Sequence, residues 1–244
     1  MRVTVIIPAL NEAGNIRRLV NEVSTSVMLT GNIEAHISVV VVDNGSTDET
    51  TAEAQASGAL VVSEARRGYG YACAAGVAIA SNADVLIFMD GDGSFDPAEI
   101  PVLLAPIAAN QAALVLGSRT GQIEPGAMPP HQQFGNRLVS GLMRLLYRIP
   151  VTDLAPYRAI QRELLLSLNM SEMTFGWPTE MMVKAARRGA QIVEVRVAYR
   201  KRWSGQSKVG GTLRGTLLAT YYIVGVTLRY GFGTSQSTSD NPKR

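Results

Sequence analysis

The chain has 244 residues, of which 46% are apolar, 18% charged and 6% aromatic, and its formal net charge is +3. That length suits one α/β domain with a sizeable core. The basic excess is too mild for a nucleic-acid-binding protein, which normally carries a stripe of lysine and arginine interleaved with aromatic residues.

Short β-branched runs alternate with helical patterns through the first half of the chain. In chain order they predict a strand at Val3–Ile7, a helix at Glu12–Ser26, a strand at Val39–Val42, a helix at Thr47–Ser57, a strand at Leu60–Val62, a helix at Gly70–Ser81, a strand at Val85–Met89, a helix at Pro97–Ala109 and a strand at Leu114–Leu116. Apolar strands between such helices are typical of a mainly parallel sheet with helices on both faces, an α/β fold. Such sheets bind ligands beyond the carboxyl ends of their strands.

The second half is less regular. A Pro/Gly-rich loop at Gly121–Gln133 is long enough to suggest a function. Beyond it the pattern predicts helices at His131–Tyr147 and Thr179–Arg188 and a strand at Ile192–Val197. We assign residues 1–210 to one domain, 211–233 to an apolar C-terminal helix and 234–244 to a polar tail that we expect to be disordered.

The single cysteine and the apolar runs bear on the compartment. Cys73 excludes an internal disulfide framework, fits a reducing compartment, and lies in an Ala-rich stretch where we expect a buried thiol. The run Val3–Ile7 is too short for a secretory signal, and Leu213–Leu228 is interrupted by an arginine and a glycine, so we expect no membrane span. We therefore expect a cytoplasmic protein, with peripheral contact to the cytoplasmic face of a membrane.

The strongest local signal is Asp90-Gly91-Asp92, directly after a predicted strand. Two carboxylates one residue apart cannot both point into a core, because burying either one unpaired costs several kcal/mol. Gly91 between them allows a ligand to approach closely. Such a pair suits a hard divalent cation shared with phosphate oxygens, namely Mg²⁺ or Mn²⁺. The alternative is an Asp-Gly turn with solvated side chains.

Two further polar segments follow predicted strands. In Asp43–Asp48, Asp43 could accept hydrogen bonds from a ribose or a base, while a serine or threonine caps the next helix. In Pro8–Glu12, Asn11 is a plausible N-cap and Glu12 suits the positive end of the helix dipole. Turns and caps alone would also explain both segments.

Together these segments resemble those of the family 2 glycosyltransferases with a GT-A fold, and within them the dolichyl-phosphate mannosyltransferase-like group. The resemblance runs from Arg2 to about Lys208. Each segment is weak evidence alone, but five in order are specific. They are Pro8-Ala9-Leu10-Asn11-Glu12, Asp43-Asn44-Gly45-Ser46-Thr47-Asp48, Asp90-Gly91-Asp92, Gly117-Ser118-Arg119, and Tyr199-Arg200-Lys201-Arg202 with Gly205-Gln206-Ser207-Lys208.

The resemblance implies inverting sugar transfer from a donor of the GDP-mannose or UDP-glucose type, often to a polyprenyl phosphate such as dolichyl or undecaprenyl phosphate. Asp90 and Asp92 would hold the metal on the donor diphosphate, and Ser94 replaces a Gln frequent in similar enzymes, so water would supply the third ligand. Arg119, Arg137 and Ser140 would receive the acceptor phosphate. Nucleotide-binding positions would be Pro8, Ala9, Asn11, Glu12, Asp43, Gly68, Asp90, Gly91, Arg202, Ser207 and Lys208.

The chemistry asks for these residue types. Charge builds up on the departing diphosphate, where a metal and fixed cations stabilise it. Guanidinium groups match phosphate oxygens two at a time, which suits Arg119 and Arg137. A phosphate acceptor is already a charged nucleophile, whereas a hydroxyl acceptor would need a base, for which Asp153 and Glu180 are candidates. Helix capping would also explain Asp153, and a dipole partner in the first turn would explain Glu180. The expected catalytic residues are Asp92, Arg119 and Asp153.

Several alternatives stay open. The acceptor could be a sugar, a glycolipid or a small hydroxyl compound, or the chain could bind nucleotide sugars without turnover, although the intact acidic pair argues against that. A redox Rossmann enzyme is disfavoured, because no glycine fingerprint follows the first strand. The loop Arg66–Gly70 could border the nucleotide or be a simple glycine turn. The stretch Leu213–Tyr230, with arginines near both ends, could rest on a membrane or pack on the domain or across a homodimer.

Overall fold

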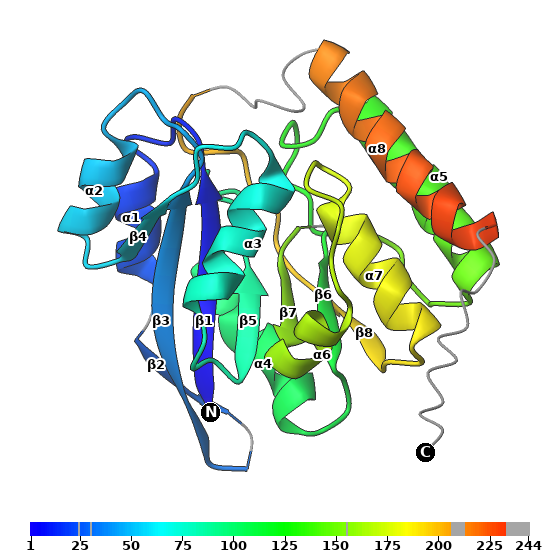
Figure 1. Ribbon diagram of the computed structural model, residues 1–244, viewed down its shortest axis with the longest axis horizontal. Coiled ribbons are helices and arrows are strands. Elements are labelled where there is room, and N and C mark those ends of the chain that lie inside the picture. Colours follow the sequence, from blue (N-terminus) through cyan, green and yellow to red (C-terminus); the bar gives the residue numbers. More distant parts are fainter. Residues whose placement is uncertain (24, 30, 155, 206–212, 233–244) are drawn as a thin grey trace, which may run out of the picture.

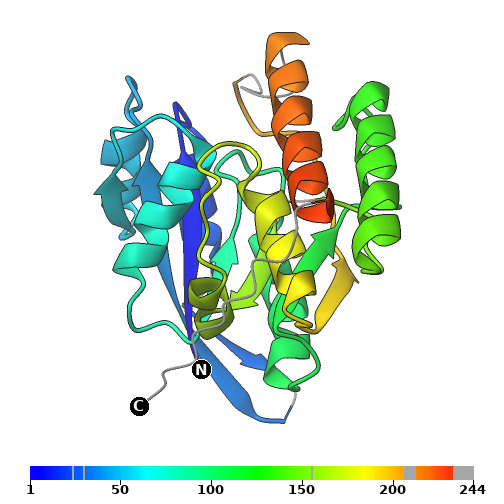
Figure 2. The same ribbon diagram turned by 45° about the vertical axis from the view of Figure 1, so that its right-hand side comes forward.

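The computed structural model describes residues 1–23, 25–29, 31–154, 156–205 and 213–232, with the side chains of 213–220 and 231–232 outside the description. Within these ranges one eight-stranded sheet carries helices on both faces (Figures 1 and 2). The strands are β1 (Arg2–Ala9), β2 (Ser26–Leu29), β3 (Ile33–Asp43), β4 (Leu60–Ser63), β5 (Val85–Phe88), β6 (Leu114–Ser118), β7 (Arg158–Gln161) and β8 (Ile192–Arg196). The helices are α1 (Ile16–Glu22), α2 (Thr50–Ala56), α3 (Tyr69–Ile79), α4 (Ile100–Ala108), α5 (Pro130–Tyr147), α6 (Arg162–Ser167), α7 (Trp177–Arg187) and α8 (Leu213–Phe232).

The strand order is β2-β3-β1-β5-β7-β6-β8, and β4 pairs with the carboxyl-terminal part of β3. β1 runs parallel to β3 and β5, β3 to β4, and β6 to β8. β2 is antiparallel to β3, and β7 is antiparallel to both β5 and β6. The predicted α/β class is therefore confirmed, although the sheet is more mixed than predicted.

Alternating side chains of the sheet pack into two hydrophobic layers, because successive residues of a strand point to opposite faces. Val5 and Ile7 of β1 pack with α1, α2 and α4 on one face. Ile6 packs with α3, α5, α6 and α7 on the other. Cys73 of α3 lies in this second layer, where burial raises the pKa of its thiol well above the ordinary value, so the predicted buried thiol is confirmed.

Three sequence-based boundaries were wrong. The helix predicted at Glu12–Ser26 is confined to Ile16–Glu22, and the segment after it forms β2. β2 pairs with the beginning of β3, with Ser26 opposite His36, so β3 begins at Ile33 rather than Val39. The helix predicted from Thr47 begins at Thr50, and β7 and α6 were not predicted.

α8 packs against the domain, beside α5 and α7 (Figures 1 and 2). Its Thr227 is buried, and the carbonyl of Thr227 accepts a hydrogen bond from the Tyr147 hydroxyl of α5. Arg187 of α7 donates to the carbonyl of Tyr230 at 2.8 Å. None of the helices in the described ranges has the length and apolarity needed to cross a membrane. The predicted tail, 234–244, lies outside the described residues.

Candidate functional site

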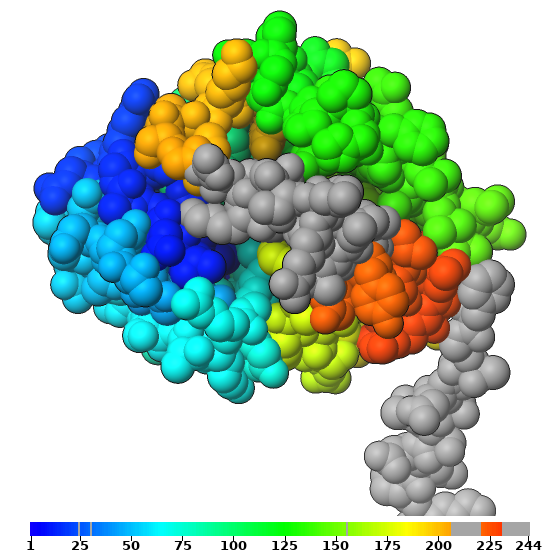
Figure 3. Space-filling model, turned by 90° about the horizontal axis from the view of Figure 1, so that it is seen from above, coloured from blue at the N-terminus to red at the C-terminus, as the bar shows by residue number. Residues whose placement is uncertain are grey.

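The predicted site residues follow strands whose carboxyl ends lie at one edge of the sheet. Ala9 at the end of β1 lies opposite Asp43 at the end of β3, and Phe88 of β5 pairs with Ile6 of β1. β6 points the same way as β5, because both are antiparallel to β7 between them. The segments that begin at residues 10, 44, 89 and 119 therefore meet at this edge, which Figure 3 views end-on.

The segments after β1 and β3 are bound to each other. The backbone N–H of Asn11 donates to the Ser46 hydroxyl at 2.9 Å, and the Asn11 side-chain oxygen accepts from the backbone N–H of Thr47 at 2.8 Å. Asn11 has φ +52° and does not cap α1, whose N-cap is Asn15, so that predicted role was wrong. The carboxylate of Asp43 accepts from the Ser46 backbone N–H at 2.9 Å, which fixes it at the turn.

Asp90 and Asp92 lie at the tip of the edge, directly after β5. One oxygen of Asp92 accepts from both the backbone N–H and the hydroxyl of Ser94, at 3.0 and 2.6 Å. Burial, followed by the charge of Asp92, raises the pKa of Asp90 to about 7, against the opposing charge of Arg119. Asp90 is therefore a carboxyl whose ionised form would gain from an added cation.

The donor set of this pair fits a hard divalent ion shared with a ligand. Among the described residues no group of three or more histidine, cysteine, aspartate or glutamate side chains is placed to enclose a metal. Two half-buried carboxylates after the end of a strand match the coordination that Mg²⁺ and Mn²⁺ adopt with phosphate and water oxygens. Ser94 holds one oxygen of Asp92 by hydrogen bonds, which orients the carboxylate.

A strap formed by residues 200–205 lies against this edge (Figure 3) and contacts the segments after β1 and β5. The guanidinium of Arg202 contacts the Glu12 carboxylate at 2.9 Å and lies 3.8 Å from Asp92. The backbone N–H of Trp203 donates to the Asp92 carbonyl at 3.2 Å. The Ser204 hydroxyl donates to the Asn15 side chain at 2.7 Å. The structure thus brings Arg202 to Glu12 and Asp92, while Ser207 and Lys208 lie outside the described residues.

Arg119 and Asp153 form a buried ion pair beside the acidic turn. The Arg119 backbone N–H and Nε donate to one Asp153 oxygen at 2.7 and 2.8 Å, and Nη2 donates to the other at 2.7 Å. The Asn136 side chain of α5 also donates to Asp153, at 2.7 Å. Burial alone would raise the pKa of Asp153, but the hydrogen bonds and charge of Arg119 lower it below the ordinary value.

The polar residues of α5 differ in their contact with this ion pair. Asn136 faces Asp153, whereas Arg137 is exposed. Ser140 is buried one turn beyond Asn136, and its hydroxyl donates to the Asn136 carbonyl at 2.6 Å. The hydroxyl proton of Ser140 therefore already takes part in a hydrogen bond within α5.

Glu180 belongs to α7 and Gly68 precedes α3, and both helices cover the same face of the sheet as α5. Burial would raise the pKa of Glu180, but donors led by Lys184 lower it to about 2. The Gly68 backbone N–H donates to the Asn44 side chain at 3.0 Å, and a Cβ on Gly68 would come within 2.5 Å of the Met173 carbonyl. Gly68 thus allows the loop before α3 to pack against the loop before α7.

Sequence reasoning missed two residues near the site, Asn136 and Arg158. Arg158 of β7 is 1% exposed and donates to the Pro178 carbonyl at 2.7 Å. Burial lowers its pKa to about 10, and its charge also opposes the raised pKa of Asp90. An arginine between apolar residues, in Tyr157-Arg158-Ala159-Ile160, was the available signal for it.

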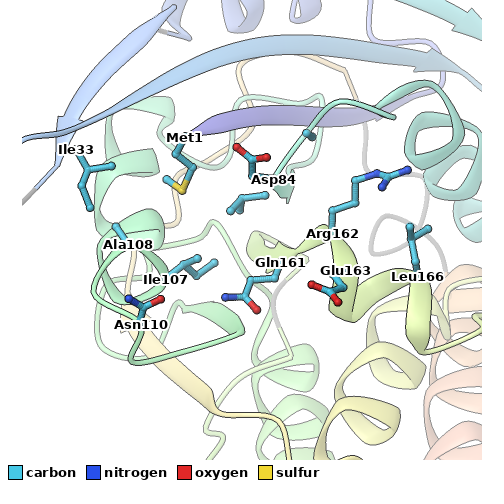
Figure 4. A pocket seen from close by; sticks show the side chains of 12 residues that line it. Met1, Ile33, Asp84, Ile107, Ala108, Asn110, Gln161, Arg162, Glu163 and Leu166 are labelled. Carbon is cyan, nitrogen blue, oxygen red and sulfur yellow. The ribbon is translucent and has the colours of Figure 1, made fainter.

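A cavity of about 610 Å³ lies at the opposite edge of the sheet, near the beginnings of β1 and β5 (Figure 4). Met1, Asp84 and Arg162 are among the residues that line it. None of the predicted site residues lines this cavity, which is separate from the edge of the sheet that carries Asp90 and Asp92.

Comparison with known proteins gives consistent results. The model of "Glycosyl transferase family 2" matches residues 4–167. An uncharacterised glycosyltransferase of Mycobacterium tuberculosis is 39% identical over 217 residues, covering 89% of this chain and 94% of the relative. The undecaprenyl-phosphate mannosyltransferase of Micrococcus luteus is 29% identical over 246 residues, covering 94% of this chain and 96% of that protein.

Solved structures of similar fold include glucosyl-3-phosphoglycerate synthase of Mycobacterium tuberculosis in complex with Mn²⁺, UDP and phosphoglyceric acid. The TM-score is 0.74 at 24% identity, covering 96% of this chain and 80% of that one. A further structure of the same synthase holds Mg²⁺ and UDP. At this identity the likeness concerns the fold, and it confirms the predicted GT-A architecture.

Proposed function

Because this chain belongs to the family 2 glycosyltransferases, we propose that it transfers a sugar, with inversion, from a GDP- or UDP-sugar to the phosphate of a polyprenyl lipid. The observation that carries the choice of acceptor is the state of the two candidate bases. Asp153 and Glu180 are both buried, both accept several hydrogen bonds, and both have lowered pKa values. A phosphate acceptor needs neither of them as a base.

The donor would lie between the ends of β1, β3 and β5. Asp43 would face the ribose or base, with Pro8, Ala9 and the Asn11 turn forming the wall beside it. Arg202, already held by Glu12, would approach the diphosphate from the strap. The metal complexes of the similar synthase with UDP support this placement.

Asp90 and Asp92 would hold Mg²⁺ or Mn²⁺ against the diphosphate, with water completing the coordination. The bound ion would stabilise the negative charge of the departing nucleoside diphosphate. Ser94 would keep the Asp92 carboxylate oriented toward it through the two hydrogen bonds described above. Gly91 between the two aspartates is buried, and a Cβ there would lie in ordinary van der Waals contact with Ile7 and Glu12, at 3.4 and 3.6 Å.

Arg119 would bind the acceptor phosphate. Its Nε and Nη2 donate to Asp153, while Nη1 makes no hydrogen bond to any described residue. That group is therefore available to an anion. Arg137 on α5 would supply a second guanidinium, and Ser140 would take part only after releasing its hydrogen bond to Asn136. The undecaprenyl-phosphate mannosyltransferase among the relatives supports a lipid phosphate as the acceptor.

A lipid acceptor requires contact with a membrane, and α5 offers a suitable surface. Phe134, Leu138 and Leu145 are 69, 63 and 77% exposed on this helix, interleaved with the exposed Arg137 and Arg144. On the adjacent α8, Tyr221, Leu228 and Arg229 are exposed. Apolar side chains beside arginines are typical of helices that lie in the headgroup region of anionic bilayers.

The proposal is tested by incubating the purified protein with Mn²⁺ or Mg²⁺ and a panel of labelled nucleotide sugars, with and without polyprenyl phosphate. We expect label from one sugar to enter the lipid phase only when the metal and the lipid phosphate are both present. Transfer to a sugar, a glycolipid or a small hydroxyl compound, with none to polyprenyl phosphate, would refute the proposed acceptor. Binding of donor without transfer or hydrolysis would indicate a non-catalytic nucleotide-sugar-binding protein.

A further inference from the structure

We propose that Asp153 is a positioning residue that holds Arg119 and α5 in one fixed arrangement for the acceptor, and that it does not act as a general base. This inference rests on the proposed function, because it assigns Arg119 and α5 to acceptor binding. It replaces the role that sequence reasoning gave to Asp153.

The hydrogen bonds of Asp153 account for its whole accepting capacity. An ionised carboxylate has about four lone-pair sites. One oxygen accepts from the Arg119 backbone N–H and Nε, and the other accepts from Arg119 Nη2 and the Asn136 side chain. The residue is 2% exposed. An acceptor hydroxyl would have to displace one of these charge-assisted or amide donors before its proton could reach Asp153.

The backbone that carries Asp153 is also fixed. The Glu194 carboxylate of β8 accepts from the Thr152 backbone N–H at 2.7 Å, from the Thr152 hydroxyl at 2.8 Å and from the Asp153 backbone N–H at 3.1 Å. The Thr152 hydroxyl also lies 2.9 Å from the Ser118 hydroxyl at the end of β6. Because β6 and β8 both hold this segment, Asp153 has little freedom to swing toward a substrate.

Asp153 connects two elements that the proposed acceptor site needs. Through Arg119 it contacts the end of β6, and through Asn136 it contacts α5. Asn136 uses both ends of its amide, because its oxygen also accepts from the Leu154 backbone N–H at 3.0 Å. Arg137 is the next residue of α5, so the docking of Asn136 sets the position of Arg137 relative to Arg119.

The substitution Asp153→Asn distinguishes a positioning residue from a general base. The amide keeps the size of the carboxylate but presents an NH₂ group to donors of Arg119, and it removes the charge that orients the guanidinium. Loss of hydrogen bonds to a charged group changes binding by about tenfold to a hundredfold. We expect the KM for polyprenyl phosphate to rise by that factor, while donor binding and kcat change by less than about threefold.

The experiment measures initial rates against polyprenyl phosphate in detergent micelles at pH 7.5, for the wild type, Asp153→Asn and Asn136→Ala. A positioning role predicts a raised acceptor KM for both variants, with kcat changed by less than about threefold. Asn136→Ala, which leaves the carboxylate in place, should give the smaller rise. This variant also decides the question if Asp153→Asn does not fold.

Asp84→Asn is the matched control. Asp84 binds Arg2 in the same way, accepting from the backbone N–H at 2.8 Å and from Nη2 at 2.7 Å, but at the opposite edge of the sheet. It should leave acceptor KM unchanged. A large fall in kcat for Asp153→Asn with unchanged acceptor KM would identify a base and overturn the inference. An unchanged acceptor KM in both variants would overturn it as well.

Failure of the proposed function would look different. The wild type would then not transfer to polyprenyl phosphate, whereas the acceptor that it does use would be found among the sugars, glycolipids and small hydroxyl compounds of the panel. The same KM and kcat comparison with that acceptor would still distinguish a positioning residue from a base.

Discussion

Gly93 lies directly against the indole ring of Trp203. A Cβ on Gly93 would come within 2.3 Å of that ring, and the backbone at Gly93 has φ +75°. Trp203 also contacts Arg18, whose guanidinium carbon lies 4.0 Å from the centroid of the indole ring. The turn that carries Asp92 therefore has no side chain at the position where the strap lies against it.

Gly93→Ala should displace the strap. We expect a lower Tm and an affinity for the nucleotide donor reduced by roughly tenfold, because Arg202 moves with Trp203. Gly121→Ala is the control, since Gly121 has φ +82° and a Cβ there would meet nothing within 4 Å. The Gly121→Ala variant therefore has only the cost of about 1–2 kcal/mol of placing an alanine at positive φ, without any contact with the strap. Equal donor affinity in the two variants, measured by calorimetry, would contradict the role of the strap.

Asp92→Ala should abolish metal-dependent transfer while leaving the fold intact. Removing a group that stabilises developing charge typically lowers kcat by about 10²–10³. The measurement is transfer rate and Mn²⁺ binding, with the circular dichroism spectrum as the check on folding. Asp84→Ala serves as the control, because Asp84 pairs with Arg2 at the opposite edge of the sheet. A folded Asp92→Ala protein with near-normal turnover would refute the metal role.

Arg137→Ala should impair use of the acceptor more than binding of the donor. We expect the acceptor KM to rise by about tenfold or more, since a guanidinium bound to phosphate contributes charge-assisted hydrogen bonds. Arg144→Ala is matched to it, being exposed on the same helix about two turns further on. If both variants show the same acceptor KM in detergent, Arg137 is not at the phosphate site.

The α5 surface should bind anionic vesicles. Replacing Phe134 and Leu138 with serine should reduce co-sedimentation with phosphatidylglycerol vesicles several-fold, because each exposed apolar side chain would otherwise enter the bilayer interface. The control replaces Ile79 and Val102, which are exposed on α3 and α4, in the same way. Equal sedimentation of both double variants would exclude this surface as the membrane contact.

The stability of the protein should depend on the ionised form of Glu180. Its folded pKa, about 2, lies below the ordinary value of 4.5, so its contribution is present above about pH 4.5 and is lost as the pH falls toward 2. Glu180→Gln should lower the free energy of unfolding in urea at pH 7, and the difference from wild type should shrink between pH 4.5 and 2. The exposed Glu163 provides the control. A difference that does not vary with pH would contradict this account.

The sequence was sufficient to predict most of the first half of the fold, because buried strands there are continuous apolar runs that end in polar turns. β2 was missed because its Val-Met-Leu run continues a helical pattern, and only pairing with β3 makes it a strand. β7 was missed for another reason. Its four residues begin with Arg158 and end with Gln161, and antiparallel pairing on both sides, which no local pattern encodes, places them in the middle of the sheet.

The predicted site residues on β1, β3, β5 and β6 share one edge because strand direction alone dictates it. The partners of those residues were not predictable in the same way. Asp153 lies 34 positions from Arg119, and Glu194 lies 42 positions from Thr152, so both contacts depend on how β6, β8 and α5 pack. In the structure Asp153, a candidate base in the sequence, is an ion-paired carboxylate bound to Arg119.

The contacts of Arg202 also bear on whether the proposed site would bind a bare metal ion or one already bound to a diphosphate. The Arg202 guanidinium already supplies a positive charge beside Glu12 and Asp92, and it would oppose the binding of a bare metal ion at the proposed site. A metal ion that arrives bound to a diphosphate would bring an anion to which Arg202 could turn. The proposed site would therefore favour the metal–diphosphate complex over the bare ion.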